Sequence, residues 1–105
     1  MANVVEVRPK GGAYETVAAS QTTQVLGTAG RVGDYLDHLV VVVATAATST
    51  VSIKDGGDTA INVFPNNPGS GIGTYIVPLG LISRTGAWQI TTGAGSSVIA
   101  VGEFH

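Results

Sequence analysis

Three side chains between positions 34 and 38 could do acid–base or metal chemistry. Asp34, Asp37 and His38 are the only place in the chain where acidic residues gather around a histidine. Carboxylates and imidazole bind divalent metals, and a carboxylate beside a histidine can act as an acid–base pair. In a β-strand, however, Asp37 and His38 would point to opposite faces, and the only other histidine, His105, ends the chain. We therefore expect a structural or capping role for this cluster.

Two glycine-containing segments could bind ions. The segment 55–58, Asp-Gly-Gly-Asp, has two carboxylates that could hold calcium, but it lacks the distal glutamate of an EF-hand, and Asp-Gly is a standard turn pair. We interpret it as a turn. The segment 69–73, Gly-Ser-Gly-Ile-Gly, lacks both the Gly-Lys-Ser/Thr that cradles phosphate and the dinucleotide-binding spacing. We expect it to be a flexible loop that could make contacts.

The chain contains no sequence motif of a hydrolase. Serine and threonine are plentiful, but no Gly-x-Ser-x-Gly elbow is present, and only His38 with Asp34 or Asp37 could form a catalytic dyad. We therefore predict no catalytic residue, no metal site, no cofactor, and a protein that is not an enzyme.

Four aromatic side chains could stack on the apolar face of a sugar. They are Trp88, Tyr14, Tyr35 and Tyr75, and Asp58, Asn66 and Asn67 would be the polar partners in such a site. A single tryptophan in an alternating strand usually belongs to the core, because one ring supplies a large buried area. We favour the core for Trp88 and keep a carbohydrate-binding module as an alternative function.

Composition argues against several classes of partner. Only 11% of the 105 residues are charged, against roughly 25% in an ordinary soluble domain. The five basic residues are scattered and the net charge is −2, which argues against nucleic acid. The apolar run from Leu39 to Ala44 is far shorter than a membrane span, and the N-terminus lacks the order of a signal peptide. We expect a protein made in the cytoplasm that binds neither nucleic acid nor membrane, and its weakly charged surface suits a subunit of an assembly.

Short segments rich in Val, Ile, Thr and Tyr alternate with clusters of Gly, Pro, Asn and Ser. This pattern predicts an all-β protein, an antiparallel β-sandwich or jelly-roll-like barrel of about eight short strands. We expect strands at 3–8, 22–27, 35–45, 49–55, 60–64, 74–79, 86–92 and 97–104. Residues 1–20 are expected to form an N-terminal arm or edge segment, and residues 21–105 a single β-sandwich domain.

Individual segments make the expectation more specific. A hairpin should join 51–54 to 61–63, with Val51 and Ile53 facing inward, and the last twenty residues should form a second hairpin. The run 39–43, Leu-Val-Val-Val-Val, does not alternate, so we expect both its faces to be covered, as in a central strand or one also buried by a partner subunit. The segment 65–73 is expected to be a loop.

Four segments together carry a resemblance to a known class of protein. They are 33–39 (GDYLDHL) leading into the Val run, 52–56 (SIKDG), the 65–73 loop and 86–93 (GAWQITTG). In these segments the chain resembles the small single-domain β-sandwich proteins of tailed bacteriophage particles, chiefly head decoration or cement proteins and related accessory subunits.

The resemblance implies a virion structural protein. As a capsid decoration or cement subunit it would bind the major capsid protein or other virion subunits, stabilise the head lattice, and form a homo-oligomer, a trimer or a dimer. Residues 1–20 would suit a clasping arm. Such proteins have no catalytic residues to carry over. The alternative within the same class is a tail or baseplate accessory subunit.

Overall fold

The computed structural model describes residues 13–28, 30–45, 50–64 and 71–104. Every regular element within these ranges is a β-strand. The strands are β1 (Ala13–Val17), β2 (Gln24–Val25), β3 (Tyr35–Val43), β4 (Val51–Asp55), β5 (Ile61–Phe64), β6 (Gly73–Ile82), β7 (Trp88–Thr92) and β8 (Ser96–Glu103).

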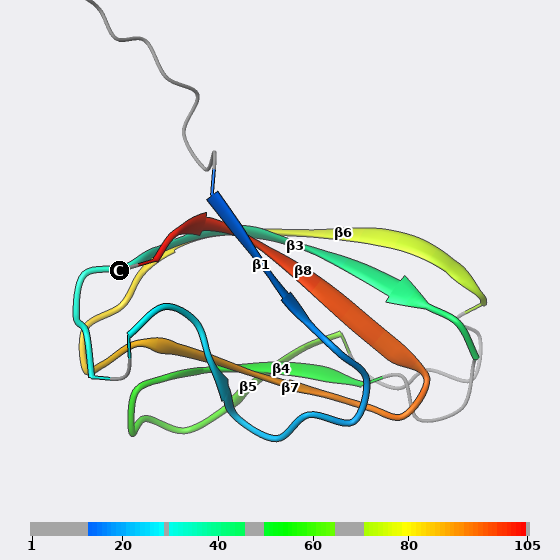
Figure 1. Ribbon diagram of the computed structural model, residues 1–105, viewed down its shortest axis with the longest axis horizontal. Coiled ribbons are helices and arrows are strands. Elements are labelled where there is room, and N and C mark those ends of the chain that lie inside the picture. The colour runs from blue at the N-terminus through cyan, green and yellow to red at the C-terminus, as the bar shows by residue number, and fades with distance from the viewer. Residues whose placement is uncertain (1–12, 29, 46–49, 65–70, 105) are drawn as a thin grey trace, which may run out of the picture.

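The strands form two four-stranded antiparallel sheets that pack as layers (Figure 1). One sheet has the order β1-β8-β3-β6 and the other the order β2-β7-β4-β5. The first strand pairs with the eighth, the second with the seventh, the third with the sixth and the fourth with the fifth. This is the arrangement of a double-sheet jelly roll, in which one long hairpin is wrapped into two layers. The predicted all-β sandwich is confirmed.

The core lies between the two sheets and is built by alternation along the strands. Each strand places every second side chain inward, so β4 buries Val51 and Ile53, and β7 buries Trp88 and Ile90. Complete burial of such a side chain contributes about 1.5–3 kcal/mol. The predicted β4–β5 hairpin and the inward face of β4 are confirmed.

The end of the chain differs from the predicted second hairpin. β7 pairs with β2 and β4 in one sheet, whereas β8 pairs with β1 and β3 in the other. The intervening turn crosses between the layers, where the Gly93 amide donates to the Thr50 carbonyl and the Ala44 amide donates to the Gly95 carbonyl. The hairpin prediction was wrong because a Gly-rich turn that joins two layers has the same sequence pattern as one that joins neighbouring strands.

The Val run forms the second half of β3, which is an interior strand of its sheet, as expected. Leu39, Val41 and Val43 are buried in the core. The expectation that both faces are covered is wrong for the single chain, because Val40 is only half-buried and Val42 is 36% exposed.

The segment 1–20 divides into two parts. Residues 1–12, which include the predicted strand 3–8, lie outside the described residues. Residues 13–17, which the sequence pattern did not indicate as a strand, form β1 at one edge of the sheet, paired with β8. Val17 of this strand is fully buried, and the Glu15 carboxylate accepts a hydrogen bond from the Gly27 amide at 2.9 Å. These contacts hold β1 against the sandwich.

Candidate functional site

The outer faces of the two sheets differ in chemistry. On the β2-β7-β4-β5 sheet, the side chains that alternate with the core residues are polar: Ser52 and Lys54 on β4, and Gln89 and Thr91 on β7. This is the ordinary pattern for an antiparallel sheet with one face in water. The β1-β8-β3-β6 sheet breaks it, because the side chains on its outer side are mostly apolar.

The strand register places these apolar side chains in rows across the sheet. One row runs from Thr16 through Ile99 and Val40 to Ile76, and carries no charge. The next row runs from Tyr14 through Val101 and His38 to Pro78. On the other side of the first row, Val42 lies between Ser97 and Thr74. We call these eleven residues the apolar outer face.

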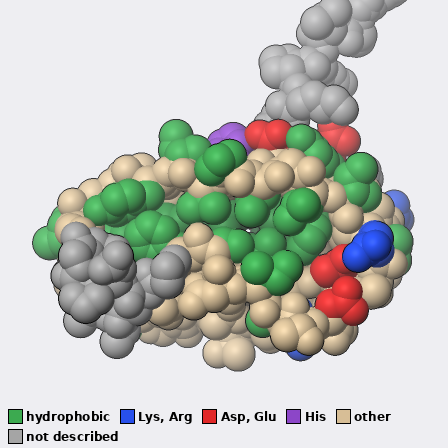
Figure 2. Space-filling view, turned by 180° about the vertical axis from the view of Figure 1, so that it is seen from behind, with side chains coloured by type: hydrophobic (Ala, Val, Ile, Leu, Met, Phe, Trp, Pro, Cys, Tyr) green, Lys and Arg blue, Asp and Glu red, His purple; other side chains and the backbone are tan. Residues whose placement is uncertain are grey.

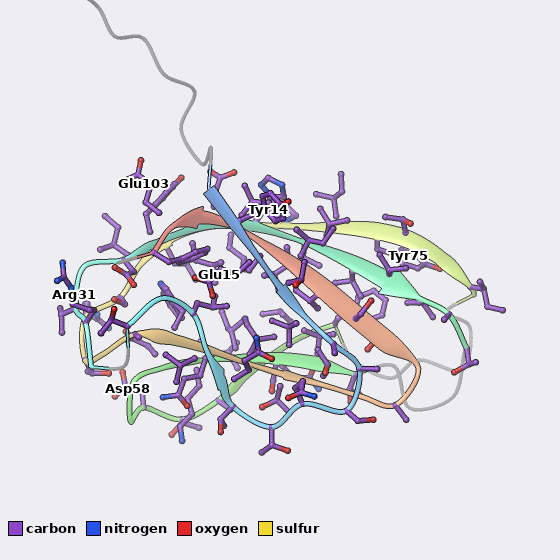
Figure 3. All side chains as sticks on the ribbon, in the orientation of Figure 1. Tyr14, Glu15, Arg31, Asp58, Tyr75 and Glu103 are labelled. Carbon is purple, nitrogen blue, oxygen red and sulfur yellow. The ribbon has the colours of Figure 1, made fainter. Side chains whose placement is uncertain are left out.

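Several of these side chains are open to solvent. Ile76 is 68% exposed and Tyr14 is 65% exposed. Figure 3 shows Tyr14 and Glu103 on the outer side of this sheet and Glu15 on its inner side. Monomeric soluble proteins rarely expose large contiguous apolar patches, so a surface of this kind indicates an interaction site.

A polar cluster borders the apolar outer face where β3 is irregular. The register of β3 shifts between Leu36 and His38 against both neighbours, so Asp37 is an extra residue in its pairing with β8. The His38 Nδ1 lies 2.7 Å from the Asp37 Oδ2, and the Tyr35 hydroxyl donates to the Asp37 Oδ1 at 2.8 Å. The expectation that Asp37 and His38 point to opposite faces was wrong, because the β-bulge removes the simple alternation.

The bulge cluster perturbs the ionisation of two of its members. The hydrogen bond from His38, helped by that from the Tyr35 hydroxyl, holds the pKa of Asp37 below its usual 3.8. The hydrogen bond that the Tyr35 hydroxyl donates to Asp37 raises the pKa of that phenol above its usual 10.0. A shallow depression beside the cluster is lined by Asp37, His38, Ile76, Pro78, Leu79 and Gly80. Among the described residues, no serine or threonine lines it.

We expect His38→Ala to raise the pKa of Asp37 toward 3.8, because the variant removes the largest cause of its lowering. An NMR titration of the Asp37 carboxyl carbon measures this. Because the pKa of Asp37 is lowered in the folded protein, ionised Asp37 stabilises the fold at any pH above the pKa of the unfolded chain. This stabilisation is lost as the pH falls through the pKa of the folded protein. An Asp37 titration with the same midpoint in both proteins would show that the contact to His38 is not made.

Asp34, the third member of the sequence cluster, has a different role. It is fully buried at the start of β3, where its carbonyl oxygen accepts from the Trp88 Nε1 at 3.0 Å and from the Ser83 amide at 2.9 Å. The backbone of Asp34 thus ties β3 to β7 and to the β6–β7 loop. Among the residues that the structure describes, no three His, Asp or Glu side chains gather where they could hold a metal ion.

The 55–58 segment is a turn whose first carboxylate organises a neighbouring loop. The Asp58 amide donates to the Asp55 carbonyl at 2.9 Å, which closes the turn. The Asp55 carboxylate accepts from the Arg84 amide at 2.9 Å and from the Thr85 amide at 3.1 Å. Its oxygens are therefore directed at the β6–β7 loop, so the segment serves as a structural turn.

Two of the aromatic side chains proposed for a sugar platform are packed against other parts of the protein. Trp88 is only 3% exposed, and its ring belongs to the core. The Tyr75 ring packs against Phe64 with centroids 5.2 Å apart, and its hydroxyl donates to the Gly71 carbonyl at 2.7 Å. The suggested polar partners Asn66 and Asn67 lie outside the described residues. The expected core role of Trp88 is confirmed, and a sugar platform built on it is wrong.

The chain matches no family model, no curated protein and no solved structure in the comparisons made. Within the described ranges, the structure contains no helix long and apolar enough to cross a membrane. The apolar outer face is therefore the feature of the described surface from which a function can be inferred.

Proposed function

We propose that the chain is a virion structural protein, a capsid decoration or cement subunit that binds a phage head lattice through protein–protein contacts. The observation that carries this proposal is the apolar outer face, which is suited to contact with another protein within an assembly. Tyr14 and Ile76 are exposed on this face, and its central row carries no charge. Contact with another protein would remove this apolar surface from water, which is favourable.

Three further features support an assembly role. Only 11% of the residues are charged, so the surface repels other protein weakly. The Asp37–His38 pair lies at the border of the apolar outer face, where it provides polar groups at the rim of a contact surface. The phage particle itself is proposed on the resemblance of segments such as 33–39 and 86–93.

The fold alone does not select among the candidates. Jelly rolls occur both in viral capsid proteins and in lectins, and function depends on the site that a fold carries. Burial of Trp88 removes the strongest feature of the lectin-like alternative. A tail or baseplate accessory subunit would use the same chemistry and would differ only in its partner.

Sedimentation with purified phage components tests the proposal. Heads and tails of the phage whose genome encodes the chain are separated and incubated with the labelled protein. We expect saturable binding to heads, at a fixed number of copies per capsid subunit, because lattice sites are repeated. Saturable binding to tails alone would support the accessory subunit instead. Protein that stays in the supernatant with both components would refute the virion role.

A further inference from the structure

We propose that the apolar outer face is covered by the same face of a second copy of this chain, in a two-fold symmetric dimer. This inference goes beyond the proposed function, because it assigns the apolar outer face to a second copy and leaves contacts with a lattice to the rest of the dimer surface. It depends on the register and exposure of the outer-face residues and not on the identity of any virion partner.

The size of the face is compatible with a reversible dimer. β3, β6 and β8 contain 9, 10 and 8 residues. At about 3.4 Å per residue and about 4.8 Å per strand, the four-stranded sheet measures roughly 30 Å by 19 Å. The resulting flat area of roughly 570 Å² per partner is below the roughly 800 Å² of a standard interface, so the dimer should be of the weaker kind that dissociates on dilution.

The chemistry of the face favours itself as the partner. The row from Thr16 through Ile99 and Val40 to Ile76 has no charge that would require a complementary charge on another protein. Two sheets pack face to face with their strands within about 30° of each other, and their apolar side chains interdigitate. Only an isologous pair buries this one face on both partners, whereas a head-to-tail ring would bury it against a different surface. The face therefore favours a dimer over a trimer.

The charged residues determine the orientation of the second copy. Asp37 and Glu103 lie toward one end of the sheet, and Val42 with its neighbours Ser97 and Thr74 lies toward the other. A two-fold axis along the strands would bring the acidic ends of both copies together. An axis across the strands separates them, because each acidic end then lies over the uncharged end of its partner.

The orientation makes a residue-level prediction. With the axis across the strands and near the central row, Val40 lies close to the Val40 of the other copy, and Ile99 lies close to its own counterpart. These two residues are paired neighbours on β3 and β8, the two inner strands of the sheet.

A second apolar surface is less suited to a copy of the chain. It lies on the flank formed by the edge strands β5 and β6, where Ile61 and Leu81 are exposed, and Figure 2 shows hydrophobic side chains across this side. Strand addition along β6 meets Pro78, which has no amide hydrogen, and Gly80, whose φ of 72° distorts the strand. The flank therefore provides a control for the outer face.

Paired lysine substitutions test the surface. Ile76→Lys places a charge on the outer face, and Ile61→Lys makes the same change on the flank, at side chains that are 68% and 52% exposed. Measured by sedimentation equilibrium, Ile76→Lys should raise the dimer dissociation constant by about 100-fold or more, because it buries an unpaired charge in the interface. For Ile61→Lys, the dissociation constant should stay within about threefold of the native value, as expected for a residue outside the interface. Circular dichroism is the control that both variants are folded.

Cysteine crosslinking tests the orientation, and the chain suits it because it contains no cysteine. We expect Val40→Cys and Ile99→Cys each to give a covalent dimer with a short bis-maleimide crosslinker, because sheets packed face to face lie about 10 Å apart, which is too far for a direct disulfide. Thr91→Cys, on the polar face of the other sheet, should remain monomeric on a denaturing gel. A dimer that is trapped through Thr91→Cys and not through the other two would contradict the assignment of the face.

Other occupants would give different results, each of which overturns the proposal. If the native chain is monomeric and deletion of residues 1–12 produces a dimer, the chain's own N-terminal segment covers the face. If the chain is monomeric with or without these residues, a second copy is not the occupant. The virion role is judged separately, because a dimer that ignores heads and tails would refute that role and leave the dimer inference standing.

Discussion

Gly102→Ala is expected to lower the free energy of unfolding by about 3 kcal/mol, at the upper end of the cost of overpacking. A Cβ atom at position 102 would overlap the carbonyl oxygen of Tyr35 and would lie 3.0 Å from the Cζ of Phe104. The nearest obstacle is backbone, so β3 and β8 must move apart at the bulge. Urea unfolding followed by Trp88 fluorescence measures the change.

Gly57→Ala is the matched control for this prediction. Nothing lies within 4 Å of a Cβ atom at position 57, so its unfolding free energy should stay within about 1 kcal/mol of the native value. If Gly102→Ala behaves like Gly57→Ala, the close approach of β8 to Tyr35 is not present in the protein.

Asp55→Ala is expected to lower the free energy of unfolding by about 3 kcal/mol, because it leaves the amides of Arg84 and Thr85 without their charged acceptor. Asp55 as a whole residue is only 9% exposed, so water replaces this acceptor poorly. The β6–β7 loop should then detach from the end of β4. Chemical denaturation at neutral pH measures the loss, and Asp58→Ala in the same turn, where the side chain is exposed, should change stability by about 0.5 kcal/mol or less.

The same site predicts a dependence on pH. Burial raises the pKa of Asp55, but hydrogen bonds from the backbone amides of Arg84, Thr85 and Gly86 and from the Thr85 hydroxyl outweigh it, so the net pKa lies below 3.8. Because the folded pKa is lowered, the stabilisation is complete above the unfolded value and is lost as the pH falls through the folded value. The stability difference between the native chain and Asp55→Ala should therefore shrink below about pH 4. A difference that stays constant down to pH 2 would contradict this assignment.

Strands could be predicted where apolar and polar residues alternate in the sequence and the apolar ones are buried. Val51 and Ile53 alternate with Ser52 and Lys54, and the structure gives β4 the faces that this alternation predicts. β1 could not be recognised in this way, because its short segment 13–17 gains its strand conformation from pairing with β8, more than 80 positions later in the chain. The crossing of the 93–95 turn between layers depends on equally distant partners.

The apolar outer face is visible in the sequence as strands whose residues do not alternate between apolar and polar, and only the Val run was interpreted in this way. The Val run of β3 lacks alternation, and the same is true of 75–79 in β6 and 98–101 in β8. Three neighbouring strands without alternation make one continuous apolar face, but their adjacency follows from the strand order β8-β3-β6, which sequence pattern does not provide. The contact between Asp37 and His38 was missed for a similar reason, because the bulge that creates it depends on pairing with β8.

The molar mass of the native chain in solution tests most directly whether the apolar outer face is an assembly surface. Light scattering across micromolar concentrations should give about twice the 10.6 kDa of one chain, with a mass that falls on dilution through the dissociation constant. A constant mass of one chain over the same range would contradict the account, because the face would then remain exposed to water with no second copy to cover it.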